Sequence, residues 1–354
     1  MALSCPCCDR RFEDRWRCAC GSPLQFETQP TPSGPASTIE PRDGLWTFAD
    51  FLPAIGEQRV TLGEGMTPLV DAPAWNATFK LEYVSPTGSF KDRGATTTIS
   101  RAASLDVDRV IEDSSGNAGV AIATYAARAG IDATIYAPAA AKPAKLDAIR
   151  RTGATLETIE GDRQAVTDAC REAVDAGEGW YASHAWNPAF FVGTMTAALE
   201  IAYQRDWHAP DTVVTPVGHG TLLIGLYDGF SALKSAGWID RVPRLLAVQA
   251  AGVAPIVEAL EGDPGASKNE LAAGVQIAEP VQRERILEAI NATDGDAIAV
   301  ADGPVTQALT ALHEAGFGCA PTSALGVAGL ERFRDGGKLD PDEDVVVPLT
   351  GVYR

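Results

Sequence analysis

The sequence has no long apolar run and no pattern of a secretory leader, and it has little positive charge. No run of 18 apolar residues occurs among its 354 residues, so no membrane-spanning helix is expected. The N-terminus, MALSCPCCDRRFEDRW, lacks the basic-then-apolar order of a signal peptide, which favours a cytoplasmic protein. With 29 lysines and arginines against 47 acidic residues, the net charge of −18 disfavours nucleic acid and anionic membranes as partners.

Lysine is especially scarce, with seven residues against 22 arginines. An acidic surplus with so little lysine is typical of a salt-adapted protein, whose carboxylates keep its surface hydrated. Hydrophobic residues make up 45% of the chain, enough for a large core and about two domains. One of the few lysines, Lys91, lies in the stretch SPTGSFKDRG. Three roles are open for it there: a surface charge, a phosphate contact or a nucleophile.

Cysteine is concentrated at the N-terminus, where five of the seven cysteines fall within the first 20 residues. Cys5 and Cys8 form a CxxC pair, and Cys18 and Cys20 form a tighter CxC pair. This spacing could bring four thiolates around one zinc ion, which would be structural because no ligand position stays open. The alternative is a set of reduced, unligated thiols. A zinc-ribbon nucleic-acid binder is the corresponding non-enzyme hypothesis, and the acidic balance argues against it.

From Asp43 onward, short β-branched runs alternate with alanine-rich helical patterns. Strands separated by helices of ten or more residues imply an α/β fold with parallel sheets and helices on both faces. Helices are expected at 119–129 and 142–151. Strands are expected to end at 110–111 and to occupy 133–136, 154–159, 212–217, 244–249 and 344–349.

Three short turns follow predicted strands, at the sheet edge where open α/β folds bind ligands. SSGN at 114–117 and GHGT at 218–221 each join a strand to a helix, whose free N–H groups suit a carboxylate or phosphate. His219 is expected to offer its backbone N–H there. The third turn, Thr350-Gly351, closes the last strand. Taken singly, each turn also fits an ordinary cap.

Taken together, these motifs are more specific. Lys91 within SFKDRG, the SSGN helix start, the GHGT loop and the final Thr-Gly resemble pyridoxal-phosphate enzymes of the tryptophan-synthase β-subunit fold, and within them the threonine synthase family. The resemblance covers nearly the whole chain. It extends to TLGEGMTPLV (61–70), VQAAGVAPIV (248–257) and APTSALGVAGL (320–330). The cysteine knuckle also recurs in some threonine-synthase-like proteins.

The resemblance implies two doubly wound parallel-sheet domains behind a small zinc-ribbon-like knuckle. The expected divisions are a knuckle at 1–27, a linker at 28–42, a larger domain at 43–85 with 186–354, and a smaller domain at 86–185. It further implies a homodimer, a pyridoxal phosphate cofactor and a small amino-acid substrate. The implied reaction is lyase chemistry that converts O-phosphohomoserine and water into threonine and phosphate.

The same resemblance implies a role for each site residue. Lys91 would form the Schiff base with the cofactor and remove the substrate's α-proton. Asn117 would hydrogen-bond the phenolic oxygen of the cofactor, and Thr350 would lie against its pyridine nitrogen. The residues implied to cradle the cofactor phosphate are Gly218, His219, Gly220 and Thr221. Those implied to bind the substrate are Thr87, Ser114, Ser115, Gly116 and His184.

One stretch departs from the family pattern. Threonine synthases bind the substrate phosphate with roughly Asn-Ser-x-Asn-Pro-x-Arg-x-x-Gly-Gln-Lys-Thr, but here, in SHAWNPAFFVGTMT, the arginine position is Phe190 and the lysine position is Met195. A phenyl ring cannot form the bidentate contact of a guanidinium. Lys80 or Arg93 could supply the missing cation. Three alternatives stay open: a threonine or serine dehydratase, a β-replacing lyase for a related amino acid, and a non-catalytic cofactor-binding paralogue.

Overall fold

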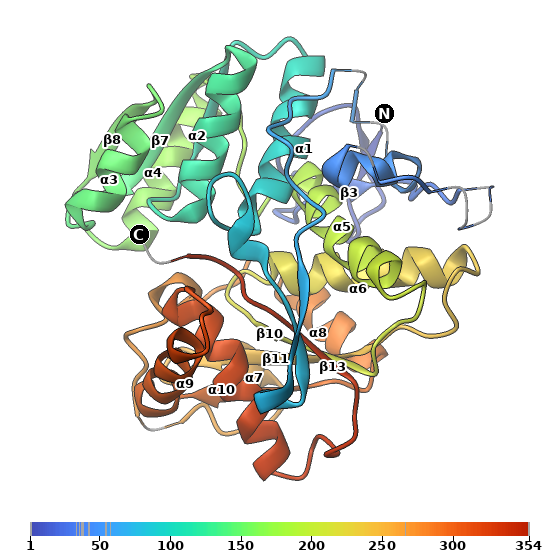
Figure 1. Ribbon diagram of the computed structural model, residues 1–354. Helices are drawn as coiled ribbons and strands as arrows, with labels where there is room; N and C mark the ends of the chain where they lie inside the picture. The colour runs from blue at the N-terminus through green and yellow to red at the C-terminus, as the bar shows by residue number, and fades with distance from the viewer. Residues whose placement is uncertain are drawn as a thin grey trace.

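The computed structural model of the chain describes residues 2–32, 34, 36, 39–41, 43–53, 55–56, 58–265 and 267–352. The predicted linker at 28–42 therefore lies partly outside the described residues. Within them, the chain forms an α/β structure with two large sheets and a small N-terminal sheet (Figure 1). No helix in the described part of the chain is long and apolar enough to cross a membrane.

The larger sheet has the strand order β12-β11-β10-β13-β5-β4. Every neighbouring pair is parallel except β4 and β5. The expectation of a purely parallel sheet is wrong at this edge, because the short Pro73–Trp75 turn of 3-10 helix that joins the two strands is too short for a parallel crossover. The strands are β4 (Leu69–Ala72), β5 (Ala77–Lys80), β10 (Thr212–Pro216), β11 (Arg244–Ala250), β12 (Asp296–Val300) and β13 (Val345–Pro348).

The smaller sheet has the order β8-β7-β6-β9 and is parallel throughout. The predicted helix at 119–129 is α2 (Asn117–Ala129), which ends where Gly130 adopts a left-handed φ of 72°. The strands and helices predicted along this region are confirmed, with ends shifted by one or two residues. The strands are β6 (Arg109–Glu112), β7 (Asp132–Pro138), β8 (Thr155–Ile159) and β9 (Trp180–Tyr181).

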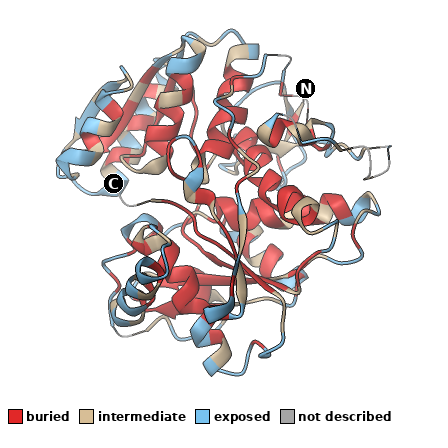
Figure 2. Cartoon of the chain, in the orientation of Figure 1, coloured by how far each residue is buried: buried red, intermediate tan, exposed pale blue. Residues whose placement is uncertain are grey.

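Helices cover both faces of each large sheet, because alternate side chains of the strands point to opposite faces. In β11, Leu245 and Ala247 join a core with α5, α6 and α8, while Leu246 and Val248 join a second core with α10. Buried residues accordingly run through the strands and the inner helix faces (Figure 2). The helices are α1 (Lys91–Ser104), α2, α3 (Pro143–Arg150), α4 (Arg163–Asp175), α5 (Pro188–Gln204), α6 (Thr221–Ser235), α7 (Pro255–Ala259), α8 (Arg283–Ala292), α9 (Asp302–Glu314) and α10 (Pro321–Asp335).

Helices α1 and α5 pack closely against each other, and between them lies a buried group of charges, the core ion cluster: Arg93 of α1, Glu200 of α5, Lys80 at the end of β5 and Glu82 just after it. Arg93 donates from Nη2 to Oε1 of Glu82 at 2.7 Å and from Nη1 to Oε1 of Glu200 at 2.5 Å. Lys80 donates from Nζ to Oε2 of Glu200 at 2.9 Å. The expectation that Lys80 or Arg93 could reach a substrate is therefore wrong, because carboxylates neutralise both cations inside the core.

The N-terminal residues form a small antiparallel sheet that contacts the smaller of the two large sheets. The ring of Trp16 lies 5.2 Å from that of Tyr181 and 5.1 Å from that of Trp186, edge to face in both cases. Trp180 donates from Nε1 to Oδ2 of Asp14 at 2.7 Å. The strands of the small sheet are β1 (Leu3–Ser4), β2 (Arg11–Phe12) and β3 (Gln25–Phe26).

Candidate active site

A cavity lies between the two large sheets, at the carboxyl ends of β6, β10 and β13, as expected for an α/β fold. We call it the lysine cavity, since Lys91 at the start of α1 lines it. The turns predicted from sequence meet there: Ser114–Ala118 after β6, Gly218–Leu222 after β10 and Thr350–Gly351 after β13. Segments far apart in sequence thus converge on a single amine.

The amine of Lys91 lies in a partly apolar setting. Its Nζ donates to Oγ1 of Thr221 at 3.0 Å and lies 4.6 Å and 5.5 Å from the ring centres of Phe90 and Phe190. Burial, opposed by Glu112 and reinforced by the charge of Arg163, lowers the pKa of Lys91 to about 7. A large fraction of this amine is therefore neutral near pH 7, and only the neutral form is a nucleophile or a base.

The turn after β10 fits a phosphate group. Gly220 has a φ of +74°, and a Cβ there would lie 2.4 Å from Cγ1 of Ile286, so only glycine fits. Among the described residues, no hydrogen bond reaches the backbone N–H groups of Gly218, His219, Gly220 or Thr221. Since these free donors open helix α6, they form an anion site with the positive end of the helix dipole behind it.

The turn after β6 forms a second helix start, at α2, where the N–H groups of Ser115, Asn117 and Ala118 have no hydrogen-bond partner among the described residues. The N–H of Gly116 donates to Oγ of Ser114 at 3.3 Å, which shapes the turn. A Cβ at Gly119 would lie 1.8 Å from the carbonyl oxygen of Ser114, so the turn packs directly on the helix. The side-chain amide of Asn117 lies against the last turn: a Cβ added at Gly351 would be 3.0 Å from its Nδ2. Two anion-binding helix starts therefore face the same cavity.

The last turn presents a neutral hydroxyl. Thr350 is buried, and its Oγ1 lies 3.3 Å from Oγ of Ser323 on α10. Ser323 is itself held by Gly351, whose N–H donates to its Oγ at 3.1 Å. A hydroxyl at this position can hydrogen-bond an aromatic nitrogen without protonating it, which fits a pyridine ring that stays neutral.

His184 and His219 lie side by side at one wall of the cavity, with ring centres 5.2 Å apart. A hydrogen bond of 2.6 Å joins Nδ1 of His184 to Oε1 of Glu112, which is fully buried. Burial raises the pKa of Glu112 and lowers the pKa values of both histidines. His219 is therefore neutral, and its Nε2 accepts a hydrogen bond from Nη2 of Arg163 at 3.3 Å.

The structure does not bring Thr87 into the lysine cavity. Its N–H donates to Oδ2 of Asp92 at 2.6 Å, and its hydroxyl donates to Oδ1 of the same carboxylate. These contacts fix the start of α1 and so aim Lys91, which is a positioning role.

Three polar residues of the site carry no clear signal in the sequence. Lys145 and Arg163 line the lysine cavity from α3 and α4, where each looks like an ordinary exposed helix residue. Glu112 contacts His184 from the end of β6. Of the three, only Glu112 has a weak sequence signal for a role in the site, since a carboxylate that ends an apolar strand just before a glycine-rich turn is unusual.

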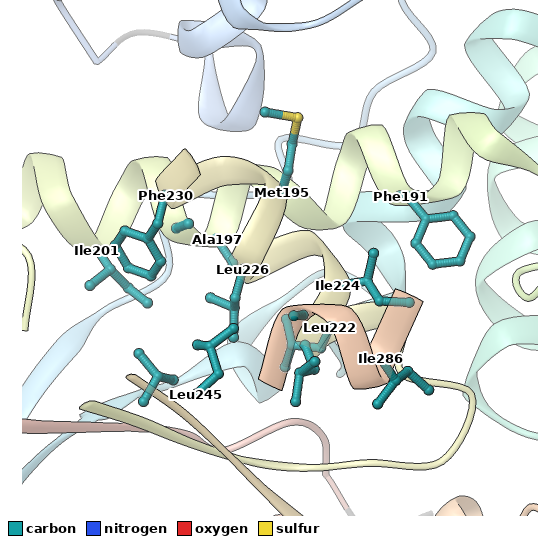
Figure 3. Close-up of a cluster of buried hydrophobic side chains, with 14 of the residues drawn as sticks. Phe191, Met195, Ala197, Ile201, Leu222, Ile224, Leu226, Phe230, Leu245 and Ile286 are labelled. Atoms are coloured by element: carbon teal, nitrogen blue, oxygen red, sulfur yellow. The ribbon is translucent and has the colours of Figure 1, made fainter. Parts of the chain in front are cut away.

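Phe190 and Met195 occupy different surroundings. Phe190 is fully buried next to α1, where a Cβ at Gly94 would lie 2.3 Å from its ring, and it lies under the amine of Lys91. Met195 points away from the cavity toward the N-terminal segment, where Nε2 of Gln29 lies 3.6 Å from its sulfur (Figure 3). Only position 190 therefore bears on the site.

The four predicted metal-ligating cysteines come together at the N-terminus. Their sulfur atoms all lie within 4.8 Å of one another, with Cys5 3.5 Å from Cys20 and Cys8 3.5 Å from Cys18. Tetrahedral zinc–thiolate sites require four sulfurs at about this spacing. Cys7 lies beside them but is exposed and outside the group.

Comparisons with known proteins agree with this geometry. Residues 60–351 match the family described as pyridoxal-phosphate dependent enzyme. The threonine synthase of Methanosarcina acetivorans is 35% identical over 321 residues, which cover 87% of this chain and 79% of the relative. That of Methanocaldococcus jannaschii is 32% identical over 323 residues, covering 87% and 80%.

Solved structures agree in fold. Maize serine racemase superposes with a TM-score of 0.69 over 80% of this chain and 87% of its own, at 21% identity. The free amine, the two anion-binding helix starts and the neutral hydroxyl are the groups that pyridoxal phosphate needs, so the cavity fits the cofactor of the family. The chain thus belongs to the pyridoxal-phosphate dependent enzymes, as a threonine synthase-like member.

Proposed function

We propose that this protein is a pyridoxal-phosphate-dependent lyase that converts O-phosphohomoserine and water into threonine and phosphate. The observation that carries the proposal is the amine of Lys91, whose pKa is lowered to about 7 in a cavity that two helix starts share. The sequence similarity to threonine synthases over most of the chain supports this reaction over others of the fold.

The residues of the cavity divide between cofactor and substrate. Gly218, His219, Gly220 and Thr221 would hold the cofactor phosphate with their backbone N–H groups, and Asn117 and Thr350 would hydrogen-bond the ring substituents. When bound, pyridoxal phosphate supplies an electron sink that makes the protons on the substrate's Cα and Cβ acidic.

The substrate would lie between Lys91 and the start of α2. The backbone donors at Ser114, Ser115 and Gly116 would hold its carboxylate at the positive end of the helix dipole. The neutral amine of Lys91 can then take the proton from Cα and later return it to Cα, because its lowered pKa lets it exchange protons near pH 7. The net change breaks the bond between Cγ and the phosphate oxygen, moves a hydrogen from Cβ to Cγ and adds the hydroxyl of water at Cβ, while the remaining proton of the water leaves with the phosphate.

A threonine or serine dehydratase is the second candidate. Phe190 favours it, since the guanidinium that the family pattern places there is absent and a dehydratase needs no phosphate contact.

A substrate panel separates these functions. Purified protein is given O-phosphohomoserine, threonine, serine and O-phosphoserine, while phosphate, threonine and oxo acids are measured. We expect phosphate and threonine from O-phosphohomoserine. Oxo acid from threonine or serine alone would establish the dehydratase. A protein that binds the cofactor and processes none of the four would be the non-catalytic paralogue.

We also propose that Cys5, Cys8, Cys18 and Cys20 bind one structural zinc ion in a zinc-ribbon-like knuckle. The convergence of four sulfurs supports it, with Cys5 and Cys18 buried. The chain provides a matched control: Cys8→Ser should abolish the zinc measured by elemental analysis, whereas Cys7→Ser should leave one equivalent bound. Equal metal content in both variants, or none in the wild type, would refute the site.

The remaining expectations stay proposals that rest on composition and resemblance. They are the domain division at 1–27, 28–42, 43–85 with 186–354, and 86–185, a homodimer, a cytoplasmic location, a salt-adapted surface, and the absence of nucleic-acid or membrane partners. Light scattering in low and high salt would test the dimer and the salt adaptation together.

A further inference from the structure

The lysine cavity opens into a second space, which we call the side chamber. Its lining includes Asp113, Thr167 and Arg171, and it extends along α4 toward the loop that ends at Trp186. Arg163, His184 and His219 line both spaces. A substrate held by its amino-acid end near Lys91 would therefore extend its side chain toward Arg163.

Arg163 has donor capacity that the protein leaves unused. Its guanidinium carries five N–H donors, and its one hydrogen bond within the described residues is that from Nη2 to Nε2 of His219 at 3.3 Å. Among the described residues it forms no ion pair. Asp113, the nearby carboxylate of the chamber, instead accepts from Oγ1 of Thr167 and from the hydroxyl of Tyr181, both at 2.8 Å.

His219 adds a second unsatisfied donor at the same junction. Burial, followed by the charges of Arg163 and Lys91, lowers its pKa, so the ring is neutral. Since Nε2 accepts from Arg163, the proton lies on Nδ1, which is buried without a hydrogen-bond partner in the described part of the chain. Buried donors without partners are rare in proteins and indicate a group that binds there.

Of the other cations near the site, Lys80 and Arg93 are ion-paired, and Arg171 and Lys145 each line just one of the two spaces. Lys80 and Arg93 belong to the core ion cluster. The guanidinium of Arg171 lies over the ring of Trp186, 5.0 Å from its centre, and its Nε has no hydrogen-bond partner among the described residues, but Arg171 lines the side chamber alone and not the junction with the lysine cavity. Lys145 lines the lysine cavity but not the side chamber.

We propose that Arg163 is a specificity-determining residue, which binds the anionic group at the far end of the substrate side chain at the junction of the two spaces. It takes over the contact that Phe190 cannot make. The substrate class is an amino acid whose side chain ends in a phosphate or a similar oxyanion. This inference rests on the proposed function, because it assumes that the substrate's amino-acid end lies at Lys91.

The test uses the holoenzyme, so that the cofactor occupies its own phosphate site. Arg163→Gln is compared with Arg150→Gln, a matched change on α3, where Arg150 pairs with Asp147 on the surface. Lys145→Gln is the competing variant. The KM for O-phosphohomoserine and the dissociation constant of inorganic phosphate are measured, together with the binding of threonine, which has no phosphate.

We expect Arg163→Gln to raise both phosphate-dependent constants about 10- to 100-fold, the value of a hydrogen bond to a charged group, and to leave threonine binding unchanged. Arg163→Lys should fall between, because an ammonium keeps the charge and loses the planar fork. Arg150→Gln should match the wild type.

Unchanged constants in Arg163→Gln, a larger effect in Lys145→Gln, or no phosphate binding by the wild type would overturn the inference. The proposed function fails separately: a wild type that binds O-phosphohomoserine through Arg163 without turning it over would retain the anion site and lose the lyase reaction. Full turnover in Arg163→Gln with wild-type constants would instead refute the anion site at Arg163 and leave the lyase reaction intact.

Discussion

Two charged groups, the core ion cluster and the partly buried amine of Lys91, lie on opposite sides of the first turn of α1. Arg93 points into the core ion cluster, where it and Lys80 contact the carboxylates of Glu82 and Glu200. Lys91, two residues earlier, points into the lysine cavity, where its hydrogen bond is to the hydroxyl of Thr221. Residues two apart on a helix point in nearly opposite directions, so one turn serves both groups.

The two groups differ in how completely their charges are satisfied. In the core ion cluster, burial alone would raise the pKa of Glu200, but Arg93 and Lys80 lower it to about 2, so the carboxylate stays charged. In the lysine cavity, burial lowers the pKa of Lys91, and no carboxylate in the described part of the chain contacts its amine. Satisfied charges hold elements together, whereas unsatisfied ones are available to ligands and protons.

The largest expected effect is on catalytic activity, which should depend on Lys91 and not on Lys80. Lys91→Met should lower kcat/KM by about 10³-fold or more, since it removes both nucleophile and base. It should also abolish the cofactor adduct that borohydride traps, as seen by mass spectrometry. The free energy of unfolding of the cofactor-free protein should equal or exceed that of the wild type. Residual activity near the wild-type level would remove Lys91 from the reaction.

The same substitution at Lys80 should act on stability instead. Lys80→Met leaves Glu200 with one cationic partner and the carbonyl of Thr67 without its 2.7 Å contact to Nζ. Breaking a buried ion pair costs about 3–5 kcal/mol, to be measured by denaturant unfolding. If Lys80→Met unfolds like the wild type but loses turnover, the division between the two groups is wrong.

A smaller effect concerns pH. The pKa of Lys91 is about 7 in the folded protein against 10.5 when unperturbed, so between these values the unfolded chain binds more protons. The free energy of unfolding of the cofactor-free protein should therefore rise with pH in this window, by at most about 1.4 kcal/mol per unit from this residue. Below pH 7 the full cost of burying the charge is present. Subtracting the curve of Lys91→Met isolates the contribution, and a difference that is flat from pH 7 to 10 would contradict the lowered pKa.

The smallest effect tests the wall beneath the amine. Phe190→Leu removes ring atoms from a fully buried site and should cost about 1–2 kcal/mol of unfolding free energy. Turnover should change only a few-fold, because Phe190 contributes packing and not charge. A loss of turnover comparable to that of Lys91→Met would give the ring a direct part in catalysis.

The sequence predicts the backbone turns of the site better than the side chains that approach it from other elements. Glycine-rich turns at strand ends mark where backbone donors meet, because the geometry of glycine and of helix starts is local, and the structure places all three turns in one cavity. The antiparallel edge strand β4 was not predicted, because only the length of its connection to β5 reveals it.

Side chains that approach the site from other elements left no local pattern. Arg163 looks like any first-turn arginine, and its contact with His219 joins residues 56 positions apart. Lys80 and Arg93 look like free cations until the fold brings Glu200 between them. Such pairings depend on tertiary packing, which periodicity does not report.

The close fit between Phe190 and Gly94 has a consequence for substitution at position 190. The ring fills the space that a side chain at position 94 would need, and its centre lies 5.5 Å from the amine of Lys91. An arginine placed at position 190 by a single mutation would be buried there without a carboxylate, at a cost of several kcal/mol. An arginine at position 190 would therefore require changes in the residues around the ring as well.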